Sequence, residues 1–305
     1  MSVVTIGTRG SALAMRQAED VAEWLIEAHP GAEVRIEVIR TSGDANTGAP
    51  LSAIGGTGLF TKELESALLD GRIDLAVHSM KDLPTTLPDG LIIGAAPERR
   101  TPYDAFIAAR HASLDALPDG ATIGTSSPRR AAQLLAHRPG LRIVDIRGNV
   151  DTRLGRVDSG DVDATILACA GLERLERDDA ITERLPAEVM MPAVGQGALA
   201  IEIRGDDTHT AEFVLPLNDG RVSAEVFAER ACLRRLEGGC QAPMGALAHA
   251  EDGVLTLRAC VCSPDGTKVL RAETTASLTY PEALGHDVAD QLLDQGAGEI
   301  LAAAR

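Results

Sequence analysis

Short apolar segments alternate with helical patterns through the first two-thirds of this 305-residue chain. Val3–Gly7 is typical of a buried strand, and Ser11 can cap the helix that follows it. Strands that alternate with helices are joined by right-handed crossovers, which produce largely parallel sheets. We therefore expect an α/β fold, in which ligands bind at the carboxyl ends of the strands. The inner face of the first helix is predicted to hold Ala14, Ala18, Val21, Leu25 and Ala28.

The alternation continues beyond the first helix. Helical spacing predicts helices over 62–69 and 150–157, and Ser127 followed by Pro128 is typical of the start of another helix. Apolar and β-branched runs predict further strands at 34–38, 73–77, 91–96, 104–109, 122–124, 141–146 and 164–170.

The pattern changes near residue 220. A helix is predicted over 222–236, and two strands at 254–262 and 267–275 flank Ser263-Pro-Asp-Gly266, a typical hairpin turn. A final helix is expected to start near Pro281. The end of the chain is therefore predicted to form a small α+β domain.

Four polar turns follow predicted strands: Thr8–Ser11, Ser79–Asp82, Thr125–Arg130 and Arg147–Asn149. Two of them belong to residues 122–156, which carry seven arginines and only two acids. A solvated basic face would explain any single one of these arginines, but a cluster at strand ends favours a cleft for a polyanion. The free amides of a helix N-terminus would add to the attraction of Arg129 and Arg130 for anions.

The whole chain is acidic, because 29 Lys and Arg oppose 45 Asp and Glu for a formal net charge of −16. Such a chain repels phosphate backbones and anionic lipid, so nucleic-acid and membrane partners are not expected. No apolar run approaches the roughly 20 residues of a membrane span, and the N-terminus shows no export-signal pattern. Five cysteines without a CxxC pair or zinc-type spacing predict reduced thiols in the cytoplasm and no metal site.

Two side chains are candidates for direct chemistry. Asp82 follows Lys81 after a predicted strand, where a carboxyl group can act as a general acid or base, although it can also simply bond local turn amides. Cys240 follows Gly238-Gly239 at a helix end, where a loop can present a thiol. Spacing alone leaves a buried loop cysteine equally open, and a covalent attachment point is as consistent as a nucleophile.

Seven motifs occur in order over most of residues 5–245: Gly7-Thr-Arg-Gly-Ser-Ala-Leu13, Gly58-Leu-Phe-Thr-Lys-Glu-Leu64, Val77-His-Ser-Met-Lys-Asp82, Gly124-Thr-Ser-Ser-Pro-Arg-Arg130, Arg147-Gly-Asn-Val-Asp-Thr-Arg153, Pro192-Ala-Val-Gly-Gln-Gly197 and Glu237-Gly-Gly-Cys-Gln-Ala-Pro243. Together they resemble the hydroxymethylbilane synthase family, also called the porphobilinogen deaminase family. The remaining C-terminal residues match it only in general pattern. Two positions depart from the family: Thr57 stands where many members carry lysine, and Pro128 replaces a common leucine.

The resemblance implies a fold of two periplasmic-binding-protein-like α/β domains around a cleft, with a small C-terminal α+β domain. It places the first domain at residues 1–97 and 198–215, the second at 103–192, and the third, which carries Cys240, at 220–305. The return of the chain to the first domain is not visible in sequence periodicity.

The resemblance also implies a transferase of tetrapyrrole (haem) biosynthesis, which condenses four porphobilinogen molecules head to tail and releases hydroxymethylbilane by hydrolysis. A dipyrromethane cofactor would be held on Cys240 through a thioether. Asp82 would protonate the leaving amine, stabilise pyrrole cations and remove the final proton. Contacts to the cofactor are implied for Ser79, Lys81, Thr125, Ser127, Arg129, Arg130 and Arg153. Contacts to the substrate are implied for Arg9, Ser11, Phe60, Arg147, Arg153 and Arg174.

A non-catalytic protein of the same two-domain architecture that binds a small carboxylate ligand is the alternative. An export signal or a DNA-binding helix-turn-helix would favour this alternative, and the sequence shows neither. We therefore expect a monomeric cytoplasmic enzyme whose partner is the small molecule porphobilinogen.

Overall fold

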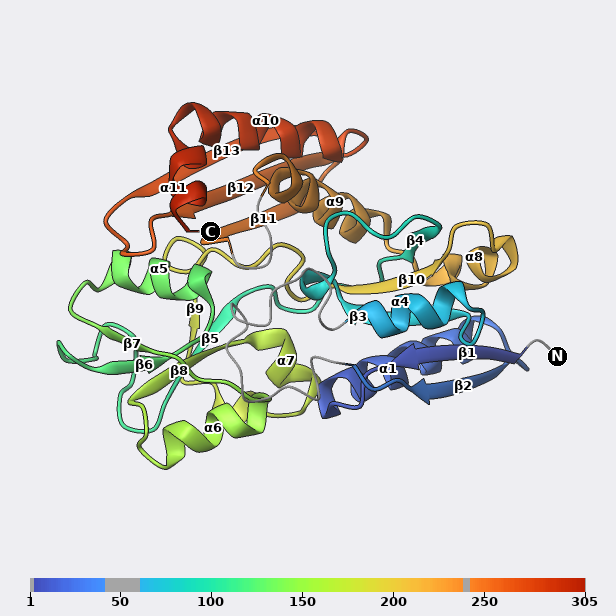
Figure 1. Cartoon of the computed structure of the whole chain (residues 1–305), viewed down its shortest axis with the longest axis horizontal. Helices are drawn as coiled ribbons and strands as arrows, with labels where there is room; N and C mark the ends of the chain where they lie inside the picture. The colour runs from blue at the N-terminus through green and yellow to red at the C-terminus, as the bar shows by residue number, and fades with distance from the viewer. Residues whose placement is uncertain (1–2, 42–60, 238–241, 305) are drawn as a thin grey trace. The chain divides into compact units, whose positions relative to one another are not determined.

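The computed structural model describes residues 3–41, 61–237 and 242–304. The chain divides into two compact units, Met1–Arg99 with Ala198–Ser223 and Arg100–Gly197 with Ala224–Arg305. It therefore enters the second unit after Arg99 and returns to the first after Gly197, a path that can be followed by colour in Figure 1. The three-domain division expected above, with its boundaries, stays a prediction.

The first unit contains a five-stranded sheet made of β1 (Val3–Thr8), β2 (Glu33–Val38), β3 (Leu75–Ser79), β4 (Leu91–Ala95) and β10 (Leu199–Arg204). The strand order is β2-β1-β3-β10-β4. β1 is parallel to both of its neighbours, whereas β10 is antiparallel to both β3 and β4.

Helices cover both faces of this sheet. α1 (Ala12–Ala28) and α8 (Thr208–Val214) pack on one face, where their apolar side chains join those of β1, β3 and β10. α4 (Lys62–Leu69) packs on the opposite face, beside Ala76 of β3. The short 3₁₀ helices η1 (Met80–Asp82) and η3 (Leu215–Leu217) follow β3 and α8.

The second unit contains a sheet made of β5 (Asp104–Ala108), β6 (Thr122–Gly124), β7 (Arg142–Val144), β8 (Ala164–Ala168) and β9 (Glu183–Leu185), in the order β7-β6-β8-β5-β9. α5 (Pro128–His137) packs on one face of it. α6 (Val150–Asp158) and α7 (Cys169–Arg174) pack on the other. The 3₁₀ helix η2 (Asp178–Ala180) precedes β9.

The two five-stranded sheets share one topology. In each, two strands lie parallel to a central strand, and the fourth strand in the order is antiparallel to both of its neighbours. The antiparallel strands, β5 and β10, are the first strands that the chain forms after it leaves the first unit at Arg99 and after it returns there at Ala198. The expected α/β fold class is confirmed, and the sheets are largely parallel as expected, because four of the five strands in each run in one direction. The exception in each sheet, which was not expected, is the strand that arrives from the other unit and runs in the opposite direction.

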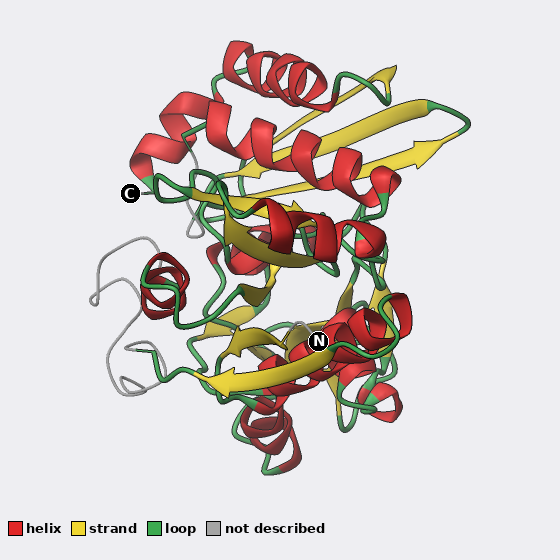
Figure 2. Ribbon diagram, turned by 90° about the vertical axis from the view of Figure 1, so that its right-hand side faces the viewer, coloured by secondary structure: helices red, strands yellow, loops and turns green. Residues whose placement is uncertain are grey.

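A three-stranded antiparallel sheet of β11 (Met244–Glu251), β12 (Val254–Cys262) and β13 (Val269–Ser277) completes the second unit (Figure 2). One face packs against α9 (Gly220–Arg235), α10 (Pro281–Asp294) and α11 (Ala297–Ala303). The other face packs against α5 and residues 187–191 through Leu247, Cys260 and Cys262. Alternate residues of β12 therefore serve two different cores, as the two-residue period of a strand requires.

Several local expectations differ from the structure. The strand expected over 164–170 ends at Ala168, so Cys169 is the first residue of α7 and not part of a strand. Ala28, expected on the inner face of α1, is exposed because it is the last residue of that helix. Within the described ranges, no helix combines the length and apolar character needed to cross a lipid bilayer.

Candidate functional site

In the first unit, β3 delivers a polar turn to the carboxyl edge of the sheet. β3 ends at Ser79, whose Oγ accepts a hydrogen bond from Gln17 Nε2 at 2.8 Å. The N–H of Met80 donates to the carbonyl of Ala198 at 3.0 Å, which ties η1 to the start of β10. Asp82 in η1 is exposed, next to the partly buried Lys81. The structure thus presents an accessible carboxyl group beside a cation at a strand end.

The β1–α1 turn carries two further predicted residues, Arg9 and Ser11. Ser11 caps α1 as predicted, since its Oγ accepts a hydrogen bond from the N–H of Ala14 at 3.3 Å. β1 and β3 are parallel neighbours, with Gly7 opposite Ala76. Both turns therefore leave the same edge of the sheet, which brings the β1 turn next to η1.

In the second unit, hydrogen bonds among its own residues hold the turn between β6 and α5. Ser127 caps α5, its Oγ accepting from the N–H of Arg130 at 3.4 Å, and Pro128 occupies the first turn, as predicted. The N–H of Ser127 donates to Oγ1 of the buried Thr125 at 3.2 Å. A cap oxygen only accepts in this role, so the hydroxyl hydrogen of Ser127 remains able to donate to an anion.

Arg129 and Arg130 are buried and share one carboxylate, that of Asp104. Arg129 Nη1 lies 2.8 Å from Oδ2 of Asp104, and Arg130 Nη2 lies 2.6 Å from Oδ1. The guanidinium groups also donate to carbonyls, Arg129 to Met191 at 2.7 Å and Arg130 to Ile166 at 2.9 Å. The three ionisable groups together leave one net positive charge, less than the two arginines suggest by themselves.

Sequence reasoning missed Asp104. Its side chain is fully buried, and burial by itself would raise the pKa of the carboxyl, but the charges of Arg129 and Arg130 outweigh burial and hold the pKa well below its usual range. A lone acid at the start of an otherwise apolar strand was the available signal, because acids are almost never fully buried unless paired.

Arg147 and Arg153 lie beside this group, in the turn after β7 and in α6. Arg153 Nε donates to the carbonyl of Gly148 at 3.0 Å. The pKa of Arg153 is lowered to about 10, mainly by burial and also by repulsion from Arg130 and Arg147, while Asp145 opposes the shift. Because β6 and β7 are parallel neighbours, both turns lie at one edge of the sheet. This edge therefore carries more positive charge than its acids neutralise.

Arg174 lies at the end of α7, the helix that follows β8. It is buried, and its Nη2 donates to the carbonyl of Gly197 at 3.1 Å. Since β8 is parallel to β6, α7 leaves the same sheet edge that carries Thr125 and Ser127. The structure thus assembles the predicted residues at one edge of each sheet.

Cys240, Phe60 and Thr57 lie outside the described residues. The four described cysteines, Cys169, Cys232, Cys260 and Cys262, are all buried. Burial raises the pKa of Cys169 to about 11 and that of Cys232 to about 12, so neither is a thiolate near neutral pH. Among the described residues, no group of three or more His, Cys, Asp or Glu side chains could hold a metal ion.

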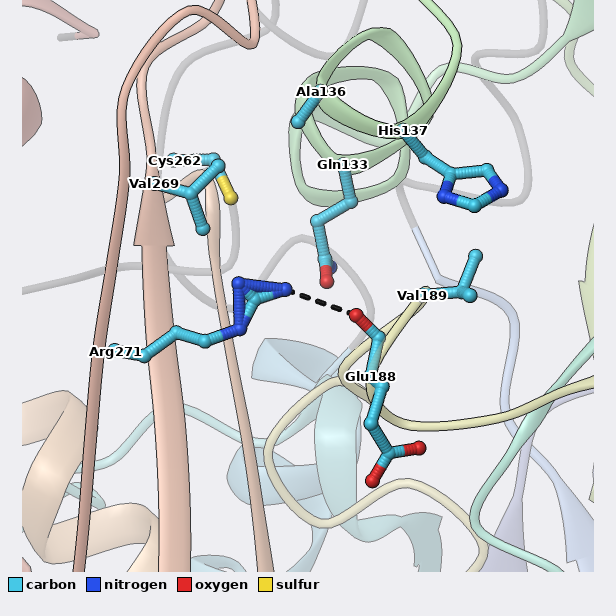
Figure 3. A pocket seen from close by; sticks show the side chains of 8 residues that line it. All are labelled: Gln133, Ala136, His137, Glu188, Val189, Cys262, Val269 and Arg271. Atoms are coloured by element: carbon cyan, nitrogen blue, oxygen red, sulfur yellow. Dashed lines mark hydrogen bonds between the residues drawn. The ribbon is translucent and has the colours of Figure 1, made fainter.

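A cavity of about 180 Å³ lies between α5 and the three-stranded sheet (Figure 3). Arg271 donates to the carbonyl of Glu188 at 2.9 Å across it, and Gln133 and Cys262 also line it. None of the residues predicted to bind cofactor or substrate borders this cavity. We therefore place the candidate site at the strand ends and not here.

Replacing Asp104 by asparagine is expected to lower the free energy of unfolding by about 3–5 kcal/mol, because two buried guanidinium groups lose their counter-charge. Thermal and urea unfolding measure the effect, and Asp115→Asn, which changes an exposed acid, is the control. Because its pKa is lowered in the folded state, Asp104 stays charged there at acidic pH values at which the same residue of the unfolded chain has already taken up a proton. The difference between parent and variant should therefore shrink as the pH falls below the ordinary aspartate value. A variant as stable as the parent at pH 7 would contradict this account.

Several solved structures resemble the chain weakly. The methionine-binding protein MetQ shares 13% identity, with a TM-score of 0.45 over 70% of this chain and 89% of that one. The periplasmic aliphatic sulphonate binding protein SsuA from Escherichia coli shares 15% identity, with a TM-score of 0.42 over 78% of this chain and 71% of that one.

Sequence relatives are much more similar and cover almost the whole chain. The porphobilinogen deaminase of Desulforudis audaxviator is 52% identical over 302 residues, which cover 99% of this chain and 98% of the relative. That of Pelotomaculum thermopropionicum is 50% identical over 99% of this chain and 97% of the relative. Residues 4–212 match the family described as porphobilinogen deaminase, dipyromethane cofactor binding domain, and residues 223–294 match its C-terminal domain. The chain therefore belongs to the porphobilinogen deaminase family, whose cofactor is a dipyrromethane.

Proposed function

We propose that the chain is a hydroxymethylbilane synthase, a transferase of tetrapyrrole biosynthesis. It joins four porphobilinogen molecules head to tail onto a dipyrromethane cofactor and releases hydroxymethylbilane by hydrolysis. The observation that carries this proposal is the identity of 52% with a porphobilinogen deaminase over 99% of the chain. We further propose that the enzyme acts in the cytoplasm, as the cysteine pattern of the sequence favours, and that it acts as a monomer.

The surplus positive charge in the second unit fits a group that carries several carboxylates. Arg153 is repelled by Arg130 and Arg147, so a bound carboxylate would relieve repulsion as well as form charge-assisted hydrogen bonds. Asp104 neutralises only one of the two arginines that it holds, and the positive end of the α5 helix dipole lies at the same edge. This edge thus fits the acetate and propionate groups of a dipyrromethane and of the pyrroles added to it.

We assign the residues as follows. The Cys240 thiol holds the cofactor through a thioether, and the cofactor supplies the free pyrrole α-carbon to which the first substrate is joined. The four described cysteines are buried, which disfavours them as attachment points. The remaining cofactor contacts are Ser79, Lys81, Thr125, Ser127, Arg129, Arg130 and Arg153. The substrate contacts are Arg9, Ser11, Phe60, Arg147, Arg153 and Arg174.

Asp82 is the catalytic acid and base in this proposal. Its exposed carboxyl group lies at the carboxyl end of β3 next to Lys81, where substrate carboxylates would be held. A carboxyl oxygen of Asp82 gives a proton to the leaving amine of porphobilinogen, and the resulting carboxylate stabilises the positive charge that develops on the pyrrole. The same oxygen then takes the proton released from the α-carbon at which the new bond has formed. The proton is thereby returned, and Asp82 is ready for the next addition.

Mass spectrometry of the intact, denatured protein tests the proposed function. We expect a mass surplus of two linked pyrrole units on the peptide that contains Cys240. Incubation with porphobilinogen should then add pyrrole units stepwise. A chain that gains no mass with porphobilinogen and binds it only reversibly would instead be a binding protein.

A further inference from the structure

Three titratable side chains that have no role in the assignments above form a buried cluster in the first unit. His78 of β3 and Glu202 of β10 are hydrogen-bonded, with Nε2 and Oε2 2.9 Å apart. Glu65 of α4 lies against them, and the exposed fractions of the three residues are 5%, 0% and 6% in that order. Buried charges and polar groups are costly unless they are paired, so this cluster requires an explanation.

The fold places these side chains between the sheet and α4. β3 and β10 are antiparallel, with Ala200 opposite His78 and Glu202 opposite Ala76. Residues two apart in a strand share a face, so His78 and Glu202 lie on the face of Ala76, which α4 covers. Glu65 is in the first turn of α4 and faces the same interface.

Two carboxyl oxygens in the cluster have no hydrogen-bond partner among the described residues, Oε1 of Glu65 and Oε1 of Glu202. Burial raises the pKa of Glu65, and the charge of Glu202 raises it further, although Thr61, His78 and Lys62 oppose the shift. A protonated Glu65 can donate to Glu202, and a single proton then satisfies both carboxyl groups. Glu202 would thus accept from His78 on one oxygen and from Glu65 on the other.

The cluster lies directly before the turn that carries Asp82. His78 directly precedes Ser79, the last residue of β3. The N–H of Met80 donates to the carbonyl of Ala198, which lies just before β10, the strand that carries Glu202. The His78–Glu202 pair therefore ties β3 to β10 at the point where η1 begins. On the other face of the sheet, the bond from Gln17 to Ser79 holds the same strand end.

We propose that His78, Glu202 and a protonated Glu65 form a positioning unit that fixes η1 and, through it, the carboxyl group of Asp82. The proposal rests on the function proposed above, because it assigns these residues to the placement of the proton-transferring group. None of the three touches substrate in this scheme. Loss of the proton from Glu65 would set two buried carboxylates against each other and loosen α4 from the strand end, so turnover should decline on the alkaline side.

Two isosteric variants separate the roles of the two glutamates. Glu65→Gln keeps a hydrogen-bond donor at the position of the protonated acid, so kcat at pH 7 should stay within about twofold of the parent, and the alkaline decline should move to higher pH. Glu202→Gln removes the negative charge to which His78 and Glu65 donate, so η1 should shift and displace Asp82 without removing it. We therefore expect kcat to fall by about 10-fold or more, with KM little changed. Glu23→Gln, which changes an exposed glutamate of α1, is the matched control.

A proton held on Glu65 in the folded state also makes the stability of the protein depend on pH. A raised pKa means that the folded chain holds a proton that the unfolded chain has lost, so stability should fall as the pH rises above the ordinary glutamate range. The melting temperature of the holoenzyme should show this decline for the parent and for Glu23→Gln, and a smaller decline for Glu65→Gln.

These measurements distinguish failure of this proposal from failure of the proposed function. A parent chain that never turns over porphobilinogen would refute the function, while the melting profiles would still test the proton on Glu65. Equal kcat values at every pH for the parent, Glu65→Gln and Glu202→Gln would refute the positioning role. Should Glu202→Gln not fold, the profiles of Glu65→Gln decide: identical slopes with pH in that variant and the parent would overturn the proposal.

Discussion

Replacing Cys240 by alanine is expected to remove both the covalent cofactor and all measurable turnover. The thioether requires the sulfur atom, and the four other cysteines are too buried to substitute for it. Intact mass and the rate of hydroxymethylbilane formation measure the two losses. Cys262→Ala is the matched control, because it removes a buried thiol on β12 and should keep the full mass surplus and turnover.

A Cys240→Ala protein with the full mass surplus would place the attachment on another residue. A protein without the surplus that still forms product at the parent rate would separate the cofactor from the reaction altogether. Either result would contradict the assignment of Cys240.

The second large effect is expected for Asp82→Asn, which should retain the cofactor and lose turnover by about 10²–10⁴-fold. Asparagine has the shape of aspartate, but it can neither give a proton to the leaving amine nor take up the proton released from the α-carbon. Asp82 is exposed, so the melting temperature should hardly change. Steady-state kinetics with porphobilinogen, intact mass and thermal unfolding measure the three quantities.

Asp89→Asn, which replaces an exposed acid in the loop before β4, should behave as the parent in all three measurements. A near-normal kcat for Asp82→Asn would remove Asp82 from the mechanism. A variant that also loses its cofactor would show that Asp82 acts in cofactor assembly and not only in turnover.

Local features of the fold could be predicted from the sequence because they depend on neighbouring residues. Ser11 and Ser127 cap their helices, and the helix over Lys62–Leu69 and the strand over Val254–Cys262 have the predicted bounds. The direction of β5 and β10 could not be predicted, because strand direction depends on pairing between segments that are distant in the sequence. An apolar run has the same two-residue period in either direction.

The antiparallel direction of β5 also explains why Asp104 was not predicted as part of the candidate site. In a wholly parallel sheet, Asp104 at the start of its strand would lie at the edge opposite the ligand-binding turns. Because β5 is antiparallel to β8, Asp104 lies opposite Ala168, at the carboxyl end of β8. The arginines at the start of α5 could be predicted as an anion-binding pair, but their shared carboxylate could not.

The antiparallel return of β10 has a consequence for the order in which the chain folds during synthesis. All five strands of the second sheet lie within residues 104–185, so that sheet can close before Leu199 has been made. The first sheet must wait for β10, which at about 5–20 residues per second means a delay of several seconds after β3 emerges. Until then β3 and β4 have unpaired edges, which are sites of misassociation. Although its first strands begin the chain, the first sheet is therefore completed after the second. Until β10 has been made, the exposed edges of β3 and β4 must be kept from pairing with other chains.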